Sequence, residues 1–304
     1  MIEVSGLTKR YGSTLAVDDL SFTIPDGTVT GFLGPNGSGK STTMRLMLGL
    51  DHGEGTTLYD GRRIEQLDSV SRVVGAHLDA KYFHPKRSAR NHLRMLASEA
   101  RLPASRVDDV VELMGLSSVA DKAPGGFSLG MGQRLGLAGA LLAAPTTLML
   151  DEPANGLDPQ SIHWLRDFLQ DYAAQGNSVF VSSHLLSEME LMADHVVVIA
   201  KGRLVADASM ADIVAQSRRN DVLVRTDAAD RDRLSGGLAG KGLTVQAEGA
   251  DGIAVAGATT DEVGRAAHEL GVVLLELTAR TASLEDAFLE LTDSDQQYKV
   301  GGGS

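Results

Sequence analysis

The most chemically informative stretch of the chain is Gly34–Thr42, which reads GPNGSGKST. It fits the pattern G-x-x-x-x-G-K-S/T, in which small residues let successive backbone N–H groups point at phosphate oxygens. The lysine of this pattern reaches the β- and γ-phosphates and the next hydroxyl binds Mg²⁺, so these roles fall to Lys40 and Ser41. Residues 29–33 predict a buried strand before the loop, and residues 42–50 predict a helix after it. This context predicts a nucleoside triphosphate site.

Two adjacent carboxylates and a histidine extend this chemistry. The apolar run 147–150 leads into Asp151 and Glu152, and a second apolar strand, 179–183, ends at His184. In an open α/β sheet, ligands bind beyond the carboxyl ends of the strands, where these side chains are expected. The first acid suits Mg²⁺, directly or through water, and the second suits activation of an attacking water. The histidine either contacts a γ-phosphate or is structural, and a solvated strand end is the alternative for the acids.

Two weaker signals need support from the rest of the chain. Residues 123–131 form a loop rich in Ser and Gly before an apolar helix predicted for 133–144. Such a loop is a candidate anion site, although most loops of this kind only cap helices. Tyr11 lies in a polar segment between the first two predicted strands, where its ring either stacks on a base or half-buries in a turn.

Composition limits the class of protein. The 304 residues are 43% hydrophobic, with 28 basic and 40 acidic side chains and a formal charge of −12. No basic stripe of the kind typical of nucleic-acid binders is visible. The chain has no cysteine, which excludes disulfides, thiolate zinc sites and a cysteine nucleophile. The longest apolar region, 135–150, is interrupted by Pro145 and predicts no membrane span.

The order of patterns predicts two domains. Residues 1–215 alternate strands and helices, with helical periodicity from about 85–145, which predicts an α/β domain with an inserted helical subdomain. Residues 219–296 read as βαββαβ, typical of a small ferredoxin-like α+β domain, and include an amphipathic helix at 283–291. This part carries seven basic and fifteen acidic residues, so it is a poor candidate for binding anionic lipid or nucleic acid. Residues 297–304 read as a tail with a linker-like GGGS end.

Taken together, the motifs resemble those of the nucleotide-binding subunit of an ABC transporter. The run Gly34–Thr42 resembles the Walker A motif of that family, and Leu148–Pro153 resembles its Walker B motif followed by a catalytic glutamate. Asn155–Asp158 resembles its D-loop. By the same resemblance, His184 is the switch histidine and Tyr11 is the aromatic residue that stacks on adenine.

The signature loop of the family aligns with Ser128–Met131, with two departures. It keeps a serine and a glycine but has Leu129 and Met131 where the usual pattern has Gly and Gln. Asp79 stands where the family commonly has the Q-loop glutamine; it is shorter and charged, and it is expected to reach Mg²⁺ through a water. These features, and the sequence 283–292, resemble the ABC-2 type branch of drug and lantibiotic exporters.

The resemblance implies an α/β P-loop ATPase domain of the ABC type, with ATP and Mg²⁺ as cofactors. It implies Glu152 and His184 as catalytic residues and Ser41, Asp79 and Asp151 as metal ligands. The residues expected to bind the nucleotide are Tyr11, Gly34, Pro35, Asn36, Gly37, Ser38, Gly39, Lys40, Ser41, Thr42, Ser128, Gly130, Met131 and Asp158.

The same resemblance implies the partners. Two copies are expected to form a head-to-tail dimer, with each ATP between Walker A of one copy and the signature loop of the other. An ABC-2 type membrane permease, docked near residues 79–85, would hold the dimer at the cytoplasmic face of the membrane, and no nucleic acid is expected. The substrate of such an exporter is drug-like, a peptide or a lipid. The alternative is a soluble ABC-type ATPase acting on nucleic acid or ribosomes, but such relatives usually carry two ATPase units, coiled coils or zinc modules.

Overall fold

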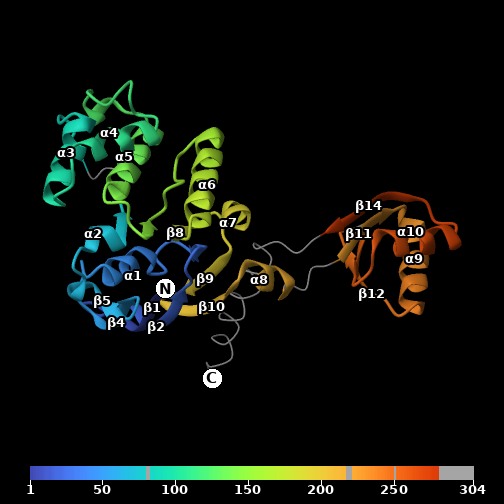
Figure 1. The fold of residues 1–304 in the computed structure, drawn as a ribbon. Helices are drawn as coiled ribbons and strands as arrows, with labels where there is room; N and C mark the ends of the chain where they lie inside the picture. Colours follow the sequence, from blue (N-terminus) through green and yellow to red (C-terminus); the bar gives the residue numbers. More distant parts are fainter. Residues whose placement is uncertain (80–82, 217–220, 250, 281–304) are drawn as a thin grey trace. The chain divides into compact units, whose positions relative to one another are not determined.

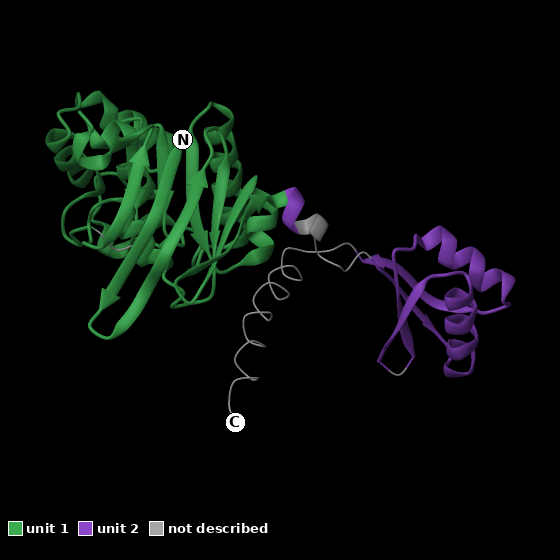
Figure 2. Ribbon diagram, turned by 90° about the horizontal axis from the view of Figure 1, so that it is seen from below, with its two compact units in different colours: residues 1–210 green, residues 211–304 purple. Residues whose placement is uncertain are grey.

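The computed structural model describes residues 1–79, 83–216, 221–249 and 251–280 (Figure 1). The chain divides into two compact units, Met1–Met210 and Ala211–Ser304, which are coloured separately in Figure 2. The helix predicted for 283–291 and the tail 297–304 lie outside the described residues.

The centre of unit 1 is a six-stranded sheet in the order β10-β9-β3-β8-β7-β6. Its strands are β3 (Val29–Leu33), β6 (Val74–His77), β7 (Thr147–Leu150), β8 (Ser178–Ser183), β9 (His195–Ala200) and β10 (Arg203–Ser209). All neighbours are parallel except β9 and β10, which form a hairpin. Every residue of β3, β7 and β8 is buried. A parallel sheet is covered on both faces, which explains why these strands are mostly apolar, with only small hydroxyl side chains among the polar residues.

A second, antiparallel sheet, in the order β2-β1-β4-β5, shares one hydrophobic core with the first. Its strands are β1 (Ile2–Tyr11), β2 (Thr14–Ile24), β4 (Glu54–Tyr59) and β5 (Arg62–Arg63). Phe22 of β2 stacks against Phe32 of β3 and Phe180 of β8, with ring centroids 5.7 Å apart in both pairs. An aromatic pair of this kind contributes about 0.5–1.5 kcal/mol beyond the area it buries. These rings fasten the two sheets to each other.

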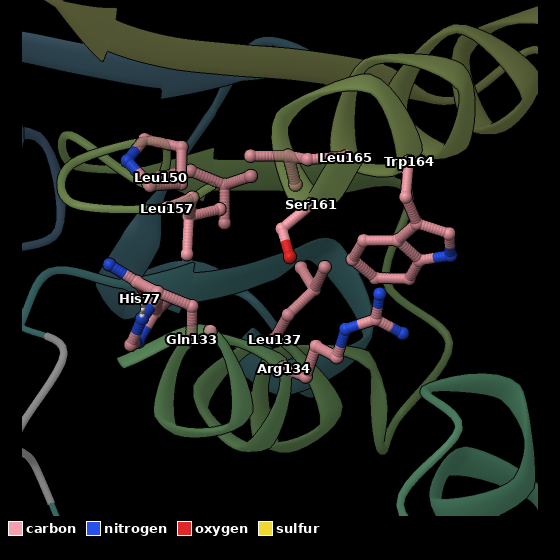
Figure 3. A pocket seen from close by; sticks show the side chains of 11 residues that line it. His77, Gln133, Arg134, Leu137, Leu150, Leu157, Ser161, Trp164 and Leu165 are labelled. Atoms are coloured by element: carbon pink, nitrogen blue, oxygen red, sulfur yellow. Dashed lines mark hydrogen bonds between the residues drawn. The ribbon is translucent and has the colours of Figure 1, made fainter. Parts of the chain in front are cut away.

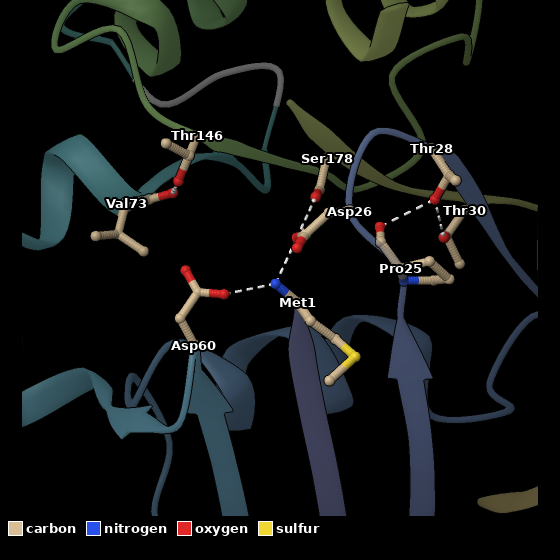
Figure 4. Close-up of polar contacts among 9 residues, drawn as sticks. All are labelled: Met1, Pro25, Asp26, Thr28, Thr30, Asp60, Val73, Thr146 and Ser178. Carbon is tan, nitrogen blue, oxygen red and sulfur yellow. Dashed lines mark hydrogen bonds and ion pairs between the residues drawn. The ribbon is translucent and has the colours of Figure 1, made fainter. Parts of the chain in front are cut away.

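Polar contacts close the edge where β8 begins (Figure 4). The amino group of Met1 lies against the carboxylates of Asp26 and Asp60, 2.6 Å from the second. The Ser178 hydroxyl donates to Asp26 at 3.3 Å, and Thr146 donates to a backbone carbonyl at 3.3 Å. These contacts join the start of β1 to the amino ends of the parallel strands, away from the edge expected to hold the site.

Helices surround the sheets of unit 1. Near the sheets lie α1 (Lys40–Met47), η1 (Ile64–Gln66), α2 (Val70–Val73), α6 (Pro159–Ala174) and α7 (Leu186–Met192). The helical subdomain consists of α3 (Ala89–Glu99), α4 (Ser105–Leu113), η2 (Pro124–Gly126) and α5 (Leu129–Leu141), gathered at one end of the unit (Figure 1). Helix α5 begins four residues earlier than predicted, because the Ser128 hydroxyl caps it by accepting from Met131 N at 3.2 Å.

The helical subdomain is attached to the central sheet through His77, the last residue of β6 (Figure 3). Its ring covers Gly136 of α5, where a Cβ would come within 2.0 Å of the imidazole. Burial lowers the pKa of His77, which keeps the ring neutral. Its Nε2 lies 2.7 Å from Gln133 Oε1, so we assign the ring proton to Nε2, which donates to the amide oxygen. Arg134, which follows Gln133 on α5, places its guanidinium 3.9 Å from the ring centroid of Trp164 on α6.

Gly136→Ala should lower the free energy of unfolding by about 1–3 kcal/mol, because overpacking displaces the His77 ring. This outcome runs against helix propensity, which favours alanine over glycine by about 1 kcal/mol. Gly139→Ala on the same helix is the control, since its Cβ meets only Leu96 Cδ1, at 3.2 Å. Urea unfolding compares the two variants with the parent, and equal stabilities of the two variants would contradict the close packing.

Unit 2 begins within helix α8 (Met210–Gln216), and its described residues also form an antiparallel sheet in the order β12-β13-β11-β14 with two further helices. In chain order the elements are β11 (Asp221–Thr226), α9 (Ala228–Gly240), β12 (Thr244–Glu248), β13 (Gly252–Ala256), α10 (Thr260–Glu269) and β14 (Leu274–Arg280). The core between sheet and helices includes Val224, Leu234, Val255 and Val263. Helix α10 begins at a capping box in which Thr259 and Glu262 bond each other's backbone N–H groups.

Candidate functional site

Three neighbouring strands of the central sheet, β3, β8 and β7, end at the same edge. The loop Gly34–Gly39 and helix α1 follow β3, His184 follows β8, and Asp151 and Glu152 follow β7. Ligands of open α/β sheets bind at this edge. The topology therefore brings the phosphate loop next to groups that follow it in sequence by more than 100 residues.

The phosphate-binding loop has a conformation that requires glycine. Gly39 has φ of 110°, and a Cβ on it would lie 2.5 Å from the carbonyl oxygen of Ala16. Helix α1 starts directly after it, at Lys40, two residues earlier than predicted. The ammonium of this lysine, only 6% exposed, donates to the carbonyl of Gly34 at 2.7 Å. The Ser38 hydroxyl is buried in the loop with no hydrogen-bond partner among the described residues, which suits a polar ligand such as phosphate.

Glu152 connects the ends of the three strands. Its carboxylate lies 3.3 Å from the Lys40 ammonium and 2.7 Å from His184 Nδ1. Its backbone has φ of 49°, in the left-handed region, a conformation that costs a residue with a side chain about 1–3 kcal/mol. Its N–H donates to Ser182 Oγ at 2.9 Å, which helps to hold that conformation. The strained backbone, the Lys40 ammonium and the His184 imidazole fix where this carboxylate points.

Ser182 is a functional candidate that the sequence analysis missed. Its hydroxyl donates to Asp151 Oδ1 at 2.5 Å and accepts from the N–H of Glu152. One buried side chain on β8 thus orients both acids that follow β7. The available signal was a pair of small polar residues, Ser182 and Ser183, at the end of an otherwise apolar strand.

Glu188 is a second residue that was missed. It lies in the first turn of α7, four residues after His184 in sequence, and its Oε2 is buried without a hydrogen-bond partner among the described residues. Burial raises the pKa of Glu188; the charge of Glu152 adds to this effect and His184 opposes it. The available signal was an acid four residues after the histidine.

The signature-loop residues lie away from the phosphate loop of the same chain. Among the described residues, no hydrogen bond or ion pair joins Ser128, Gly130 or Met131 to that loop. Leu129 instead packs on Gly156, where a Cβ would lie 2.3 Å from Leu129 Cδ2. The beginning of α5 therefore contacts the loop that follows Glu152 within one chain.

The carboxylate of Asp158 is already engaged within the chain. It caps helix α6 by accepting from Ser161 N at 2.9 Å and from Ser161 Oγ at 3.0 Å. These bonds to Ser161 hold the pKa of Asp158 below its usual range. Its position in the predicted D-loop is thus fixed by a helix cap, and its expected contact with nucleotide stays a prediction.

Tyr11 and Asp79 lie at other places around the site. Tyr11 is the last residue of β1, not part of a separate turn, and its side chain is half exposed. Asp79 is exposed and follows β6 by two residues. The charges of Asp79 and Asp151 both favour protonation of His77, against the larger effect of burial, so both carboxylates lie near the end of β6.

The oxygen donors expected for a metal suit Mg²⁺. Ser41 in the first turn of α1 offers a hydroxyl, and Asp79 and Asp151 offer carboxylates, all hard ligands. No group of three or more His, Asp or Glu side chains able to hold a metal occurs among the described residues. Mg²⁺ commonly takes one or two carboxylates and completes its shell with phosphate and water.

Comparisons with known proteins agree with this geometry. Residues 17–155 match the family model described as ABC transporter, and residues 220–285 match a domain of unknown function, DUF8746. An uncharacterized ABC transporter ATP-binding protein of Bacillus subtilis, YhcH, is 42% identical over 67% of this chain and 68% of its own length. The bacitracin transport ATP-binding protein BcrA of Enterococcus faecalis is 33% identical over 100% of this chain and 97% of its own.

Two further comparisons extend the likeness. The fluoroquinolones export ATP-binding protein of Mycobacterium tuberculosis is 33% identical over 96% of this chain and 93% of its own. A solved structure titled "Structure of ATP binding subunit of ABC transporter" superposes with a TM-score of 0.64 at 26% identity, covering 71% of this chain and 92% of that one.

The fold and the strand-end cluster define a P-loop ATPase domain of the ABC type. The chain belongs to the family of ABC transporter ATP-binding proteins. The predicted fold class, an α/β P-loop ATPase domain of the ABC type, is thereby confirmed. No helix among the described residues has the length and apolar character needed to cross a bilayer.

Ser182→Ala should lower the rate of ATP hydrolysis by roughly 10- to 100-fold, the effect of losing about 1.5–3 kcal/mol from a hydrogen bond to a charged group. Steady-state phosphate release measures it. Ser178→Ala, at the other end of the same strand and bonded to Asp26, is the control and should change the rate less than about 2-fold. Equal rates for the two variants would show that Ser182 does not orient the acids.

Proposed function

We propose that this chain is the ATP-hydrolysing subunit of an ABC-2 type exporter, working as a head-to-tail dimer beside a separate membrane permease. The observation that carries the proposal is the cluster of Lys40, Glu152 and His184 at the ends of three adjacent strands. Hydrolysis of a γ-phosphate needs a cation that binds the phosphates and a group that positions the attacking water. This edge of the sheet offers an ammonium, a carboxylate and an imidazole for these tasks.

Each residue of the cluster has a distinct role in the proposed reaction. The ammonium of Lys40 and the N–H groups of the loop bind the β- and γ-phosphates. Glu152 orients the attacking water and accepts its proton, and His184 contacts the γ-phosphate. Mg²⁺, held by Ser41 and Asp151 and through a water by Asp79, would neutralise charge on the phosphates. The remaining loop residues and Tyr11 bind the nucleotide.

The ion pair between Lys40 and Glu152 gives this site a nucleotide-dependent arrangement. The ammonium lies between the carbonyl of Gly34 and the Glu152 carboxylate. A triphosphate in the loop competes for the same ammonium, which frees the carboxylate for water. Nucleotide binding thus exchanges the partners of both groups before the chemical step: the ammonium contacts phosphate, and the carboxylate contacts water.

The dimer supplies the contacts that one chain lacks. Ser128, Gly130 and Met131 begin α5 without a bond to their own phosphate loop, so they are free to contact nucleotide in a second copy. Ser161, which bonds the Asp158 carboxylate, lies next to them: its hydroxyl would be 3.5 Å from a Cβ on Gly130. Closure of two copies on ATP and opening after hydrolysis would provide the conformational step that drives transport.

The names of the relatives support export over action on nucleic acid or ribosomes. BcrA relatives are named for bacitracin transport, and the mycobacterial relative is named for fluoroquinolones export. On that basis we assign a drug-like or peptide substrate class, with a lipid as the remaining candidate. The assembly would lie on the cytoplasmic face of the membrane.

Glu152→Gln should reduce steady-state ATP hydrolysis by at least about 100-fold while leaving ATP binding intact, because the amide cannot accept the proton of water. The variant should also accumulate as a dimer in ATP and Mg²⁺, which size-exclusion chromatography with light scattering detects. Unchanged turnover would remove Glu152 from the catalytic role.

Lys40→Ala provides the contrasting variant, since its ammonium is proposed to bind phosphate. It should weaken ATP binding about 10-fold or more in calorimetry and should abolish the ATP-dependent dimer. If both variants bound ATP with the parent's affinity, the site would lie elsewhere.

The exporter assignment predicts a membrane partner. The chain, expressed at native level with a tag, should fractionate with membranes and co-purify with a polytopic helical protein. Vesicles containing both should move a labelled peptide antibiotic or fluoroquinolone only with ATP, and Glu152→Gln should stop transport without breaking the complex. Recovery with ribosomes or nucleic acid in place of a membrane protein would favour the alternative function.

A further inference from the structure

Tyr11 is held by a carboxylate that the proposed function does not use. The Tyr11 hydroxyl donates to Asp51 Oδ2 at 3.0 Å. The same carboxylate accepts two bonds from Arg45, Nε to Oδ2 at 3.0 Å and a terminal nitrogen to Oδ1 at 3.3 Å. Arg45 lies in the last turn of α1, the helix that begins at the phosphate loop. A chain of bonds thus joins the phosphate-binding helix to the aromatic ring.

The segment that carries Asp51 is fixed in place against β1. A Cβ on Gly53 would lie 2.5 Å from the carbonyl oxygen of Thr8, and Glu54 pairs with Thr8 in the antiparallel sheet. The Lys9 ammonium donates to the carbonyl of His52 at 2.5 Å. The position of the carboxylate beside the ring is therefore set by backbone packing.

The ring of Tyr11 is oriented from two sides. Its hydroxyl is tied to Asp51, and the Lys9 ammonium lies 4.9 Å from its centroid, within the range of a cation–π contact. Half of the side chain is nevertheless exposed. The guanidinium of Arg45 holds the pKa of Asp51 below its usual range, with a smaller contribution from the tyrosine hydroxyl, so the acceptor stays charged. A charged acceptor forms the stronger hydrogen bond.

We propose that Asp51, braced by Arg45, is a positioning residue that holds the Tyr11 ring in place for stacking on the base of the nucleotide. The inference rests on the proposed ATP site and adds to it a residue outside its motifs. A ring fixed before binding loses little conformational entropy when a base stacks on it. Arg45 lies on α1, which begins at the phosphate loop. Helix α1 therefore sets the distance between the phosphate loop and the Tyr11 ring.

In this arrangement, different residues recognise the base and the phosphates of the nucleotide. Loss of the hydrogen bond between Asp51 and Tyr11 should weaken binding of the base. It should leave binding of the phosphates unchanged, since Lys40 and the loop do not depend on Asp51. A residue needed only for folding would affect both ligands alike. ADP and inorganic pyrophosphate, titrated with Mg²⁺ in a calorimeter, distinguish these cases without hydrolysis.

Asp51→Ala should weaken ADP binding about 3- to 10-fold, the change in affinity expected from loss of one hydrogen bond, and should change pyrophosphate affinity less than about 2-fold. Tyr11→Phe, which keeps the ring and removes the hydroxyl, should show the same split. Combining the two substitutions should add little to either, because both remove the same bond. Asp51→Asn, which keeps an oxygen acceptor without charge, should fall between Asp51→Ala and the parent.

Asp68→Ala is the matched control. Asp68 pairs with Arg62 at 3.2 Å, the same six-residue spacing as Asp51 and Arg45, but it is exposed and forms no hydrogen bond to a tyrosine among the described residues. This variant should bind both ligands as the parent does and should match the melting temperature of Tyr11→Phe within about 2 °C, as expected for surface changes.

The outcomes separate this inference from the proposed function. If the parent binds ADP in a Lys40-dependent manner but Asp51→Ala binds it equally well, the positioning role is wrong and the ATP site stands. Equal weakening of ADP and pyrophosphate would also overturn the positioning role. If the parent binds neither ligand, the ATP site and the positioning role both fall.

Discussion

The structure depends on one topological constraint: β3, β8 and β7 are neighbours in a parallel sheet, so their carboxyl ends lie side by side. Each strand contributes one kind of group at that edge, a phosphate loop with Lys40, an imidazole at His184 and a pair of acids ending in Glu152. The aromatic stack of Phe22, Phe32 and Phe180 underlies the same part of the sheet. The same strands therefore carry both the packed core and the charged groups at the sheet edge, so displacement of β8 would disturb both.

Local signals in the sequence were enough to predict the strand–loop–helix context of Lys40 and the acids after β7. Those signals are backbone requirements: apolar runs for buried strands, glycines for a tight loop and breakers for turns. Boundaries were less predictable. The helix after Ser128 starts earlier than its apolar pattern suggests, because a side-chain cap outweighs the low helix propensity of the glycines that follow. Tyr11 belongs to a strand because it pairs with Thr14 of β2, which polarity alone does not reveal.

What the sequence could not supply is the pairing of groups across the fold. The contact of Glu152 with Lys40 joins residues 112 positions apart, and the bond from Ser182 to Asp151 crosses from one strand to the next. Such pairs depend on sheet order, and no motif encodes it. The left-handed backbone conformation of Glu152 was equally unpredictable, because it depends on contacts with neighbouring residues and not on the residue type. Residues of this kind explain why the motifs mark the site but do not describe how it is held.

The fit of His77 over Gly136 has a consequence for how related sequences can diverge. The imidazole occupies the volume that any larger side chain at position 136 would need. A lineage that replaces the glycine must first or simultaneously shorten the residue at position 77, and then the amide of Gln133 loses its donor. Positions 77, 133 and 136 are thus expected to covary as a trio, and the joint between the helical subdomain and the sheet should change by coordinated steps rather than by independent drift.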